Sequence, residues 1–595
     1  MLKRDMFSLL LQCKQKEFTN QRELAGALQF SLGKTNALLQ SARAEGFLTE
    51  AFALTSAGEE ALAPYRVKNA ILMAAGMSSR FAPLSYEKPK GLLNVRGEIL
   101  IERQIRQLLD SGIKEIIVVV GYMKEKFFYL EEKFGVTIVI NEDYYRYNNI
   151  STLYVTAEYL DNTYICSSDN YFTENVFEPY VYKSYYAAEY SEGTTEEWCM
   201  KADDKGRIRH VTIGGDHAWY MVGHAYFDRT FSAQFTQFMR KEYDLPGVKN
   251  GYWENVYINH LADLDMEIRP YPEGVLCEFD SLEDLRVFDE DYLNNVDSEI
   301  FSHIRKALSC RARDIRILKP LKSGMSNLSF LFEVNGHSYV YRHPYAESSD
   351  YVNRANEADA MESAKAAGIR TTCIHLNKET GRKISEYIHD PIPMDPKDPA
   401  HVKAAMAMIR NLHDHAPATS FAFDITLQLK KFDHTICGQN RGDFADYTSM
   451  KKRTAAFIKD LSLSERKTDG KQVLCHIDFH PDNVIFDKDN NLYLLDWEYA
   501  AMADPMCDLG TYVCCTDTSV SEAESLLTTY LGHAPSAKES YRFLAVTSVM
   551  ALYWFSWALY QEAIGKLVGK SMYDWYKVCK TYAEAASLKI STEIS

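Results

Sequence analysis

The pattern of apolar and polar positions divides the chain into three parts. Residues 1–66 carry short amphipathic runs that predict three helices, then a hairpin-like segment and a fourth helix. From Val67 onward, apolar runs alternate with amphipathic helices, which predicts a mostly parallel sheet covered on both faces. A charged helical stretch near residues 290–304 ends this pattern. Beyond it, strands come first and a long helical part follows.

Length and composition agree with a multidomain protein. A chain of 595 residues is too long for one core, so we expect domains at residues 1–66, 67–295 and 296–595. The net charge of −16 argues against a surface built mainly for nucleic acid or an anionic membrane. The 12 cysteines show no zinc-type spacing, and the apolar run at the N-terminus is too short for a membrane span. We therefore expect a cytoplasmic protein with reduced thiols and no membrane partner.

The first 66 residues resemble a winged helix-turn-helix domain. The resemblance implies that Lys34, Thr35, Asn36 and Arg43 lie on the helix that would enter a groove of DNA. Basic and acidic residues nearly balance in this segment, however, and such domains also serve as protein-contact or regulatory modules. We expect a role of that kind, with DNA binding as the alternative.

A loop suited to phosphate follows the first predicted strand of the second domain. The segment AILMAAGMSSRFAPLSYEKPKGLL places Gly76, Ser78 and Arg80 directly after a buried run, and Lys90 ten residues beyond Arg80. Glycine lets the backbone approach phosphates closely, and the cations can stabilise charge at the reacting phosphorus. From roughly residue 68 to residue 290 the chain resembles the nucleotidyltransferase family that makes nucleotide-sugars and CDP-choline.

This resemblance implies a nucleotide site and a metal site. The residues implied to bind the nucleoside triphosphate are Gly76, Ser78, Arg80 and Lys90. Arg80 and Lys90 would also be catalytic. Asp169, after the buried run NTYICSS, and Glu254, in GYWENVY, would be magnesium ligands, although family members often carry Asp at the second position. The two carboxylates would hold Mg²⁺ while a substrate phosphate attacks the α-phosphorus and pyrophosphate leaves.

A further segment, YRYNNISTLYV, resembles the phosphocholine cytidylyltransferase branch of this family. The resemblance implies CTP as the nucleotide and places Asn149 beside the substrate or the base. Aromatic side chains near a quaternary ammonium would form a cage around it. The candidates for this cage are Trp198, Trp219, Tyr220 and Trp253. For any one of them, core packing is the alternative explanation.

A second chemical motif lies near the C-terminal end. HIDFHPDN followed by LYLLDWE places Asp478, Asn483 and Asp496 in the order used for phosphoryl transfer from ATP. One carboxylate must position the acceptor hydroxyl, while an Asn and another Asp hold magnesium. With the strands and helices before it, from about residue 313, this part resembles the choline/ethanolamine kinase and aminoglycoside phosphotransferase family.

The second resemblance also implies roles for upstream residues. Asp478 would orient and deprotonate the alcohol, with Asn483 and Asp496 as the Mg²⁺ ligands. Arg342 stands where protein kinases use Lys, and Glu357 on the next helix would aim it at the phosphates of ATP; a surface salt bridge is the alternative. The other implied nucleotide-binding residues lie in a Gly/Ser turn and in a hinge that contacts adenine, and they are Ser323, Gly324, Ser326, Asn327, Glu386 and Ile388.

The acceptor alcohol is indicated by aromatic residues near the C-terminus. Trp554 and Trp557 lie on one face of a predicted helix, where an apolar core stripe is the alternative explanation. The resemblance implies that they form the wall of a choline pocket, to which Tyr573 would add and where Glu498 would offset the positive charge. Ethanolamine is a close rival, because it can hydrogen-bond. A sugar or an aminoglycoside would need polar residues in place of the two Trp.

The two resemblances meet at one intermediate, phosphocholine. In fold class we expect a multidomain α/β and α+β protein: a winged helix, a Rossmann-like nucleotidyltransferase sheet and a protein-kinase-like bilobal fold. We expect choline and ATP to give phosphocholine and ADP, and phosphocholine and CTP to give CDP-choline and pyrophosphate, both with Mg²⁺. One alternative is a sugar or aminoglycoside kinase fused to another nucleotidyltransferase. The other is a winged-helix regulator with ligand-sensing, degenerate enzyme domains. The oligomeric state stays open.

Overall fold

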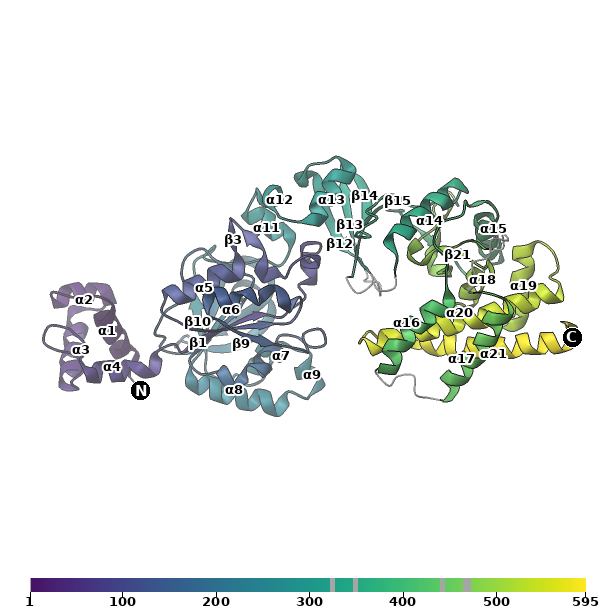
Figure 1. Ribbon diagram of the computed structural model, residues 1–595. Helices are drawn as coiled ribbons and strands as arrows, with labels where there is room; N and C mark the ends of the chain where they lie inside the picture. The colour runs from purple at the N-terminus through teal and green to yellow at the C-terminus, as the bar shows by residue number, and fades with distance from the viewer. Residues whose placement is uncertain (1, 322–326, 346–351, 439–444, 464–471, 595) are drawn as a thin grey trace. The chain divides into compact units, whose positions relative to one another are not determined.

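The computed structural model describes residues 2–321, 327–345, 352–438, 445–463 and 472–594 (Figure 1). The chain divides into two compact units, Met1–His303 and Ile304–Ser595. The division falls within helix α13 (Glu299–Leu308), a few residues after the boundary expected at residue 295.

The N-terminal segment contains four helices. They are α1 (Arg4–Gln15), α2 (Gln21–Leu28), α3 (Leu32–Ala44) and α4 (Ser56–Leu62). An antiparallel bridge between Leu48 and Leu54 lies between the last two helices, where the hairpin-like segment was expected. Side-chain oxygens of Asn20, Ser31 and Thr55 accept hydrogen bonds from the first turns of α2, α3 and α4, which fixes where these helices begin.

Three of the four residues expected on a groove-facing helix are already engaged within this segment. Lys34 forms an ion pair with Asp5 at 2.8 Å, and Arg43 forms one with Glu50 at 3.1 Å. Thr35 is fully buried. The cations of α3 are therefore partly neutralised by their own domain.

The rest of the first unit is built on a seven-stranded sheet. Its order is β10 (Glu267–Pro270), β8 (Tyr185–Ala202), β9 (Ile208–Phe227), β6 (Thr163–Ser167), β1 (Asn69–Ala74), β4 (Glu115–Val120) and β5 (Thr137–Ile140). The strands β6, β1, β4 and β5 are parallel, whereas the long hairpin of β8 and β9 is joined antiparallel to β6. The central strands are almost wholly buried, as expected for a sheet covered on both faces.

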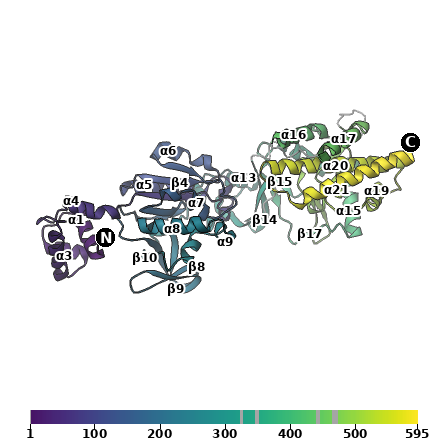
Figure 2. The same ribbon diagram turned by 90° about the horizontal axis from the view of Figure 1, so that it is seen from below.

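Helices cover both faces of this sheet, as Figure 2 shows. One apolar core includes Ile101, Ile105 and Leu108 of α5, and the other includes residues of the helices on the opposite face. The helices of the two layers are α5 (Leu100–Asp110) and α6 (Tyr129–Phe134) on one face, and α7 (Ile150–Val155), α8 (Arg229–Glu242) and α10 (Trp253–Asn259) on the other. The Rossmann-like sheet predicted from the sequence is confirmed; the long antiparallel hairpin was not predicted.

A small second sheet lies beside the carboxyl ends of these strands. It pairs β7 (Asn170–Phe172) with β11 (Leu276–Glu278), so that Asn170 lies opposite Glu278. The remaining short elements of this unit are β2 (Asn94–Val95), β3 (Glu98–Ile99), α9 (Pro246–Lys249), α11 (Leu282–Phe288) and α12 (Tyr292–Asn295). The pairing of β7 with β11 brings residues more than one hundred positions apart into one site.

The second unit has a strand-rich part and a helical part. The first contains an antiparallel sheet in the order β12 (Ile315–Pro320), β13 (Asn327–Val334), β14 (His337–Pro344), β16 (Lys383–Glu386) and β15 (Cys373–Leu376), with helix α14 (Arg354–Ala366). The helical part contains α15 (Pro399–His415), α16 (Ile425–Gly438), α17 (Ala445–Asp460), α18 (Met506–Cys514), α19 (Val520–Leu531), α20 (Ala537–Ala563) and α21 (Lys570–Lys589). This confirms the kinase-like arrangement.

Short strands flank the segment that contains Asp478 and Asn483. They are β17 (Ile392–Pro393), β18 (Val473–Cys475), β19 (Val484–Phe486), β20 (Leu492–Leu494) and β21 (Ala501–Ala503). At the centre of the helical part, α20 is long and apolar enough to cross a membrane by length and composition alone. Of its most apolar stretch, however, 94% is buried inside the fold, so we interpret it as a core helix.

Two candidate active sites

A cavity of about 570 Å³ opens at the carboxyl ends of β1 and β6 in the first unit. In open α/β sheets this is the edge where ligands bind. Ser78 there adopts a left-handed backbone conformation (φ 49°), which turns the chain sharply after β1. The predicted site residues that line the cavity are Gly76, Ser78, Arg80, Lys90, Asn149 and Asp169.

Two cations and two carboxylates face each other in this cavity. The Lys90 ammonium lies 2.5 Å from Asp169 Oδ2, and the Arg80 guanidinium lies 3.0 Å from Asp280 Oδ1. Asp169 Oδ1 is buried and has no hydrogen-bond partner among the described residues. A buried carboxylate oxygen without a donor is a fitting ligand for Mg²⁺, which prefers oxygen.

Glu278 is a carboxylate of this site that the sequence reasoning missed. The pairing of β7 with β11 brings it beside Asp169, and its Oε2 accepts a hydrogen bond from the Gly223 N–H at 3.2 Å. Loss of hydration, followed by the negative charge of Asp169, raises the pKa of Glu278 to about 7, although the residue keeps an exposed surface. Asp280, two residues on, lines the same cavity. The signal in the sequence was the pair of acidic residues in CEFDS, of which Glu278 ends β11 and Asp280 follows two positions later.

The structure places Glu254, the expected second metal ligand, in a different group. Its Oε1 accepts a hydrogen bond from the Tyr186 hydroxyl at 2.9 Å, and its Oε2 lies 3.5 Å from the amide nitrogen of Asn149. Burial raises the pKa of Glu254 to about 7. Because Glu278 stands beside Asp169 and Glu254 does not, the geometry favours Glu278 and Asp280 as the partners of Asp169.

The expected aromatic cage is only partly assembled. Trp253 is 1% exposed and stacks on Tyr186 in the core, so it is not a cage residue. Trp198 meets Tyr252 edge to face at 6.0 Å, and Tyr252 lines the cavity. Trp219 packs on Tyr190 instead. Trp198 therefore contacts one aromatic side chain that lines the cavity, Tyr252, while Tyr144 and Tyr145 line it as a second aromatic pair.

The second unit contains a larger cavity, of about 1230 Å³. The predicted site residues that line it are Asn327, Arg342, Asp478, Asn483, Asp496, Glu498, Trp554 and Trp557. Ser323, Gly324 and Ser326 lie outside the described residues. Glu386 ends β16 and Ile388 follows it by two positions, and neither is among the residues that line the cavity.

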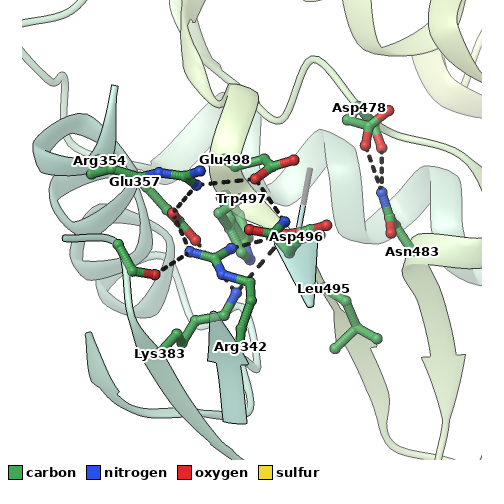
Figure 3. Close-up of polar contacts among 12 residues, drawn as sticks. Arg342, Arg354, Glu357, Lys383, Asp478, Asn483, Leu495, Asp496, Trp497 and Glu498 are labelled. Carbon is green, nitrogen blue, oxygen red and sulfur yellow. Dashed lines mark hydrogen bonds and ion pairs between the residues drawn. The ribbon is translucent and has the colours of Figure 1, made fainter. Parts of the chain in front are cut away.

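Arg342 is the centre of a buried ion-pair network (Figure 3). Its guanidinium lies 2.6 Å from Glu357 Oε2 and 3.1 Å from Asp496 Oδ1. Burial alone would raise the pKa of Glu357, but the positive charges of Arg342, Lys383 and Arg354 together outweigh this effect and lower the pKa to about 2. The predicted pair exists and is buried, so the surface salt bridge considered as its alternative is wrong.

Glu498, expected beside a cationic substrate, is engaged inside the protein. Its Oε2 lies 3.1 Å from the Arg354 guanidinium and accepts a hydrogen bond from the Asn327 amide at 3.1 Å. The side chain lines the cavity, but its charge is already matched by Arg354. The sequence could not show this, because Arg354 lies 144 positions away along the chain.

Two neighbouring side chains, Asn483 and His480, hold the Asp478 carboxylate. The Asn483 amide donates to Asp478 Oδ2 at 3.1 Å, and the His480 imidazole lies 3.6 Å from Asp478 Oδ1. Burial raises the pKa of Asp478, but the charge of His480 and these hydrogen bonds lower it below its usual value. The Leu495 N–H donates to the Asn483 carbonyl at 2.8 Å, which ties Asn483 to the hairpin that ends at Asp496. The Asn483 amide nitrogen is used by Asp478, which leaves its oxygen for a metal. Carboxylate and amide oxygens from Asp496 and Asn483 suit Mg²⁺.

The backbone before Asp478 is strained and anchored. Ile477 has φ 68°, a conformation that β-branched residues rarely adopt. The buried carboxylate of Asp508 accepts the backbone N–H groups of His476 and Ile477, at 2.9 and 2.5 Å. His413 lies 2.9 Å from the same carboxylate. Asp508 therefore fixes the backbone of the loop that carries Asp478.

An aromatic wall stands on one side of the same cavity. Trp554 lies 5.9 Å from Trp557 and 6.0 Å from Trp575, and Trp557 lies 6.2 Å from Trp575, measured between ring centroids. Tyr499 meets Trp554 edge to face at 5.6 Å. All four residues line the cavity that contains Asp478.

Tyr573, expected in this wall, points elsewhere. It is 60% exposed and stacks on Tyr576. The face of α21 toward the cavity instead carries Asp574, Trp575 and Val578, which are spaced as one face of a helix requires. The sequence therefore indicated the helix that reaches the cavity, but Tyr573 lies on the exposed face of that helix.

Comparison with known proteins supports this division. A model of the phosphotransferase enzyme family matches residues 317–544, and a model of the MobA-like NTP transferase domain matches residues 70–189. The 2-aminoethylphosphonate cytidylyltransferase of Lancefieldella rimae is 38% identical over 229 residues, which are 38% of this chain and 93% of that protein. The choline-phosphate cytidylyltransferase of Streptococcus pneumoniae is 34% identical over 221 residues, 37% of this chain and 96% of that protein. A crystal structure of choline kinase LicA from Streptococcus pneumoniae covers 48% of this chain and 100% of its own, with 22% identity and a TM-score of 0.40.

The chain is thus a transferase with two nucleotide-dependent sites. It belongs to the cytidylyltransferase family of the first two relatives and carries, in its second unit, a kinase-like domain matched by the phosphotransferase enzyme family.

Proposed function

We propose that the chain makes CDP-choline in two steps, choline kinase activity in the second unit and CTP-dependent cytidylyl transfer in the first. The observation that carries the proposal is the wall of Tyr499, Trp554, Trp557 and Trp575 in the cavity that also holds Asp478. Aromatic faces attract a quaternary ammonium, which has no hydrogen to donate. The choline-phosphate cytidylyltransferase of Streptococcus pneumoniae, similar to the first unit, supports phosphocholine as the shared intermediate.

In the kinase step, Asp478 accepts the proton of the choline hydroxyl as its oxygen attacks the γ-phosphorus of ATP. The new oxygen–phosphorus bond forms while the bond to the bridging oxygen of ADP breaks. The low pKa of Asp478 keeps it ionised and ready to accept a hydrogen bond at neutral pH. Asn483 and Asp496 would hold Mg²⁺, which when bound offsets charge on the phosphates. Arg342, on strand β14, contributes positive charge that offsets the charge of the phosphates.

In the transfer step, a phosphate oxygen of phosphocholine attacks the α-phosphorus of CTP, and pyrophosphate leaves. Lys90 and Arg80 lie where they can exchange their carboxylate partners for phosphate oxygens and stabilise charge on the transferring group. Asp169, Glu278 and Asp280 would hold Mg²⁺. We place the choline group beside Trp198 and Tyr252, with the Glu254 carboxylate nearby.

The test is a substrate panel on the purified full chain with Mg²⁺. Choline plus ATP should give ADP, and phosphocholine plus CTP should release pyrophosphate. Ethanolamine should be a poorer substrate, since it cannot use the aromatic wall as fully. Turnover of ethanolamine, a sugar or an aminoglycoside without turnover of choline would remove choline from the proposal.

A second candidate concerns the first unit alone. Its relative from Lancefieldella rimae is named for 2-aminoethylphosphonate, whose primary amine can donate hydrogen bonds. Glu254 and Asn149 offer a carboxylate and an amide for such an amine. The ratio of kcat/KM for phosphocholine over 2-aminoethylphosphonate decides between the two substrates. A ratio below one would make 2-aminoethylphosphonate the preferred substrate of the first unit.

We further propose that residues 1–66 form a winged-helix module for protein contact rather than DNA binding. The near balance of basic and acidic residues in this segment, where Lys34 and Arg43 each lie beside a carboxylate, supports this. Titration of the full chain with mixed-sequence duplex DNA at physiological salt should show no saturable binding. Saturable binding that is lost in Arg43→Ala would instead establish the DNA-binding role.

A further inference from the structure

A lysine beside Arg342 lies at the centre of the kinase ion-pair network. Lys383 begins β16, and the pairing of β16 with β14 places it directly opposite Arg342. Its ammonium lies 3.4 Å from Glu357 Oε1 and 3.9 Å from Asp496 Oδ1 (Figure 3). The side chain is only 11% exposed, and the residues lining the cavity include Arg342 but not Lys383.

Two cations directly opposite each other on neighbouring strands repel, and a buried lysine is costly unless it is paired. Both costs are offset here by shared carboxylates. Arg342 binds Glu357 Oε2 while Lys383 binds Glu357 Oε1, so both oxygens of this carboxylate are fixed. The same two cations flank Asp496 Oδ1.

The charges of this cluster are balanced only when Lys383 is counted. Three cations face three carboxylates. The cations are Arg342, Arg354 and Lys383, and the carboxylates are Glu357, Asp496 and Glu498. Without Lys383, the cluster would carry an excess negative charge beside the carboxylate expected to bind Mg²⁺. Arg342 would then be the only cation in contact with Asp496 among the described ion pairs.

We propose that Lys383 is a positioning residue of the kinase site. It holds Glu357 and Asp496 in the orientation in which Arg342 can reach the phosphates of ATP and Asp496 can bind Mg²⁺. When Arg342 turns toward the phosphates, Lys383 keeps Glu357 Oε1 in place. The inference rests on the proposed function only in that the second unit binds ATP with Mg²⁺; it does not depend on which alcohol is phosphorylated.

The test compares Lys383→Met and Lys383→Arg with a matched control. Lys378→Met is that control, because Lys378 lies in the turn between β15 and β16 and pairs with Asp359 at the surface, at 3.0 Å. Calorimetry measures the affinity of a non-hydrolysable ATP analogue with and without Mg²⁺, and kinetics give KM for ATP and kcat.

We expect Lys383→Met to weaken binding of the analogue about 10- to 100-fold in Mg²⁺, as for other residues that orient metal ligands, and much less without Mg²⁺. Lys383→Arg should recover most of the affinity, and Lys378→Met should match the wild type. An equal loss with and without Mg²⁺ would mean that Lys383 contacts the nucleotide directly. A lower unfolding temperature with unchanged affinity would mean a purely structural role. Either result overturns the inference.

Failure of the proposed function gives a different pattern. If the wild-type chain binds the ATP analogue with Mg²⁺ but does not phosphorylate choline, the substrate is wrong, and the binding measurements on Lys383 keep their meaning.

Discussion

Both candidate sites contain a largely buried cation–carboxylate pair, Lys90 with Asp169 in the first unit and Arg342 with Glu357 in the second, but the first unit adds a pair that is exposed. In the second unit the side chain of Arg342 is 7% exposed and that of Glu357 is fully buried. In the first unit the side chains of Arg80 and Asp280 are 74% and 44% exposed. A surface pair can exchange partners at little cost, whereas breaking a buried pair leaves a charge in a low-dielectric interior. The kinase site is therefore organised by folding, and the outer part of the transferase site is left free to rearrange around its nucleotide.

The largest expected effect separates the two chemistries. Asp478→Asn should lower kcat of the kinase step by about 10³-fold, because the variant keeps the shape but cannot accept a proton. Pyrophosphate release from supplied phosphocholine and CTP should stay at the wild-type rate. ADP and pyrophosphate are measured on the same preparation. Loss of both reactions in a folded protein would contradict two separate sites.

The second prediction tests the difference in depth. Glu357→Ala should lower the stability of the second unit by about 3–5 kcal/mol, since it removes the buried carboxylate that Arg342, Arg354 and Lys383 share. Asp280→Ala, which leaves an exposed Arg80, should change the stability of the first unit by less than about 1 kcal/mol. Urea unfolding of the full chain measures both, with ATP and CTP used to assign each transition by the unit they stabilise. Equal effects would remove the distinction drawn between the sites.

The third prediction concerns which carboxylates serve the transferase metal. Glu278→Gln should lower the apparent affinity of pyrophosphate release for Mg²⁺ by about 10- to 100-fold. Glu254→Gln should leave the Mg²⁺ dependence unchanged and raise KM for phosphocholine instead. Rates are measured across a Mg²⁺ titration at saturating CTP. The reverse pattern would restore Glu254 to the role expected from the sequence.

The aromatic wall supplies a smaller effect. Trp575→Ala should raise KM for choline about 3- to 30-fold, the range expected for one cation–π contact in a partly desolvated pocket. Tyr573→Ala, two residues away on the exposed face, should leave KM within about twofold of the wild type, as expected for a surface change. The same assay with ATP held saturating checks both variants. A matching rise in both would mean that α21 presents a different face.

The sequence predicted the parts of these sites that depend on neighbouring residues, and it missed those that depend on contacts between distant segments. Local motifs were sufficient for Asp478, Asn483 and Asp496, and the structure brings all three to one cavity. The helix that continues the aromatic wall was identified, but its rotation depends on packing against α20, so Tyr573 was chosen in place of Trp575. Tertiary packing, which a single sequence does not display, decided that choice.

The transferase metal site shows the same limit at longer range. Glu278 reaches Asp169 only because β11 pairs with β7 across more than one hundred residues. Glu254 follows aromatic residues in sequence and fitted the pattern of an acidic ligand, but folding placed it against Tyr186. Pairings between short strands carry little local signal, and one such pairing brings Glu278 beside Asp169.

The smallest effect concerns the charge of Glu254. Its pKa is raised by burial to about 7, so the side chain is neutral below this pH and carries a buried charge above it. A carboxyl whose folded pKa is raised contributes stability at low pH and loses it as pH rises from its ordinary value toward 7. Glu254→Gln mimics the neutral form, so the unfolding transition of the first unit, which CTP shifts, should lie close to that of the wild type at pH 5 and several degrees higher at pH 8. Scanning calorimetry of the full chain across this pH range measures the difference. A constant offset at all pH values would show that Glu254 does not titrate in this window.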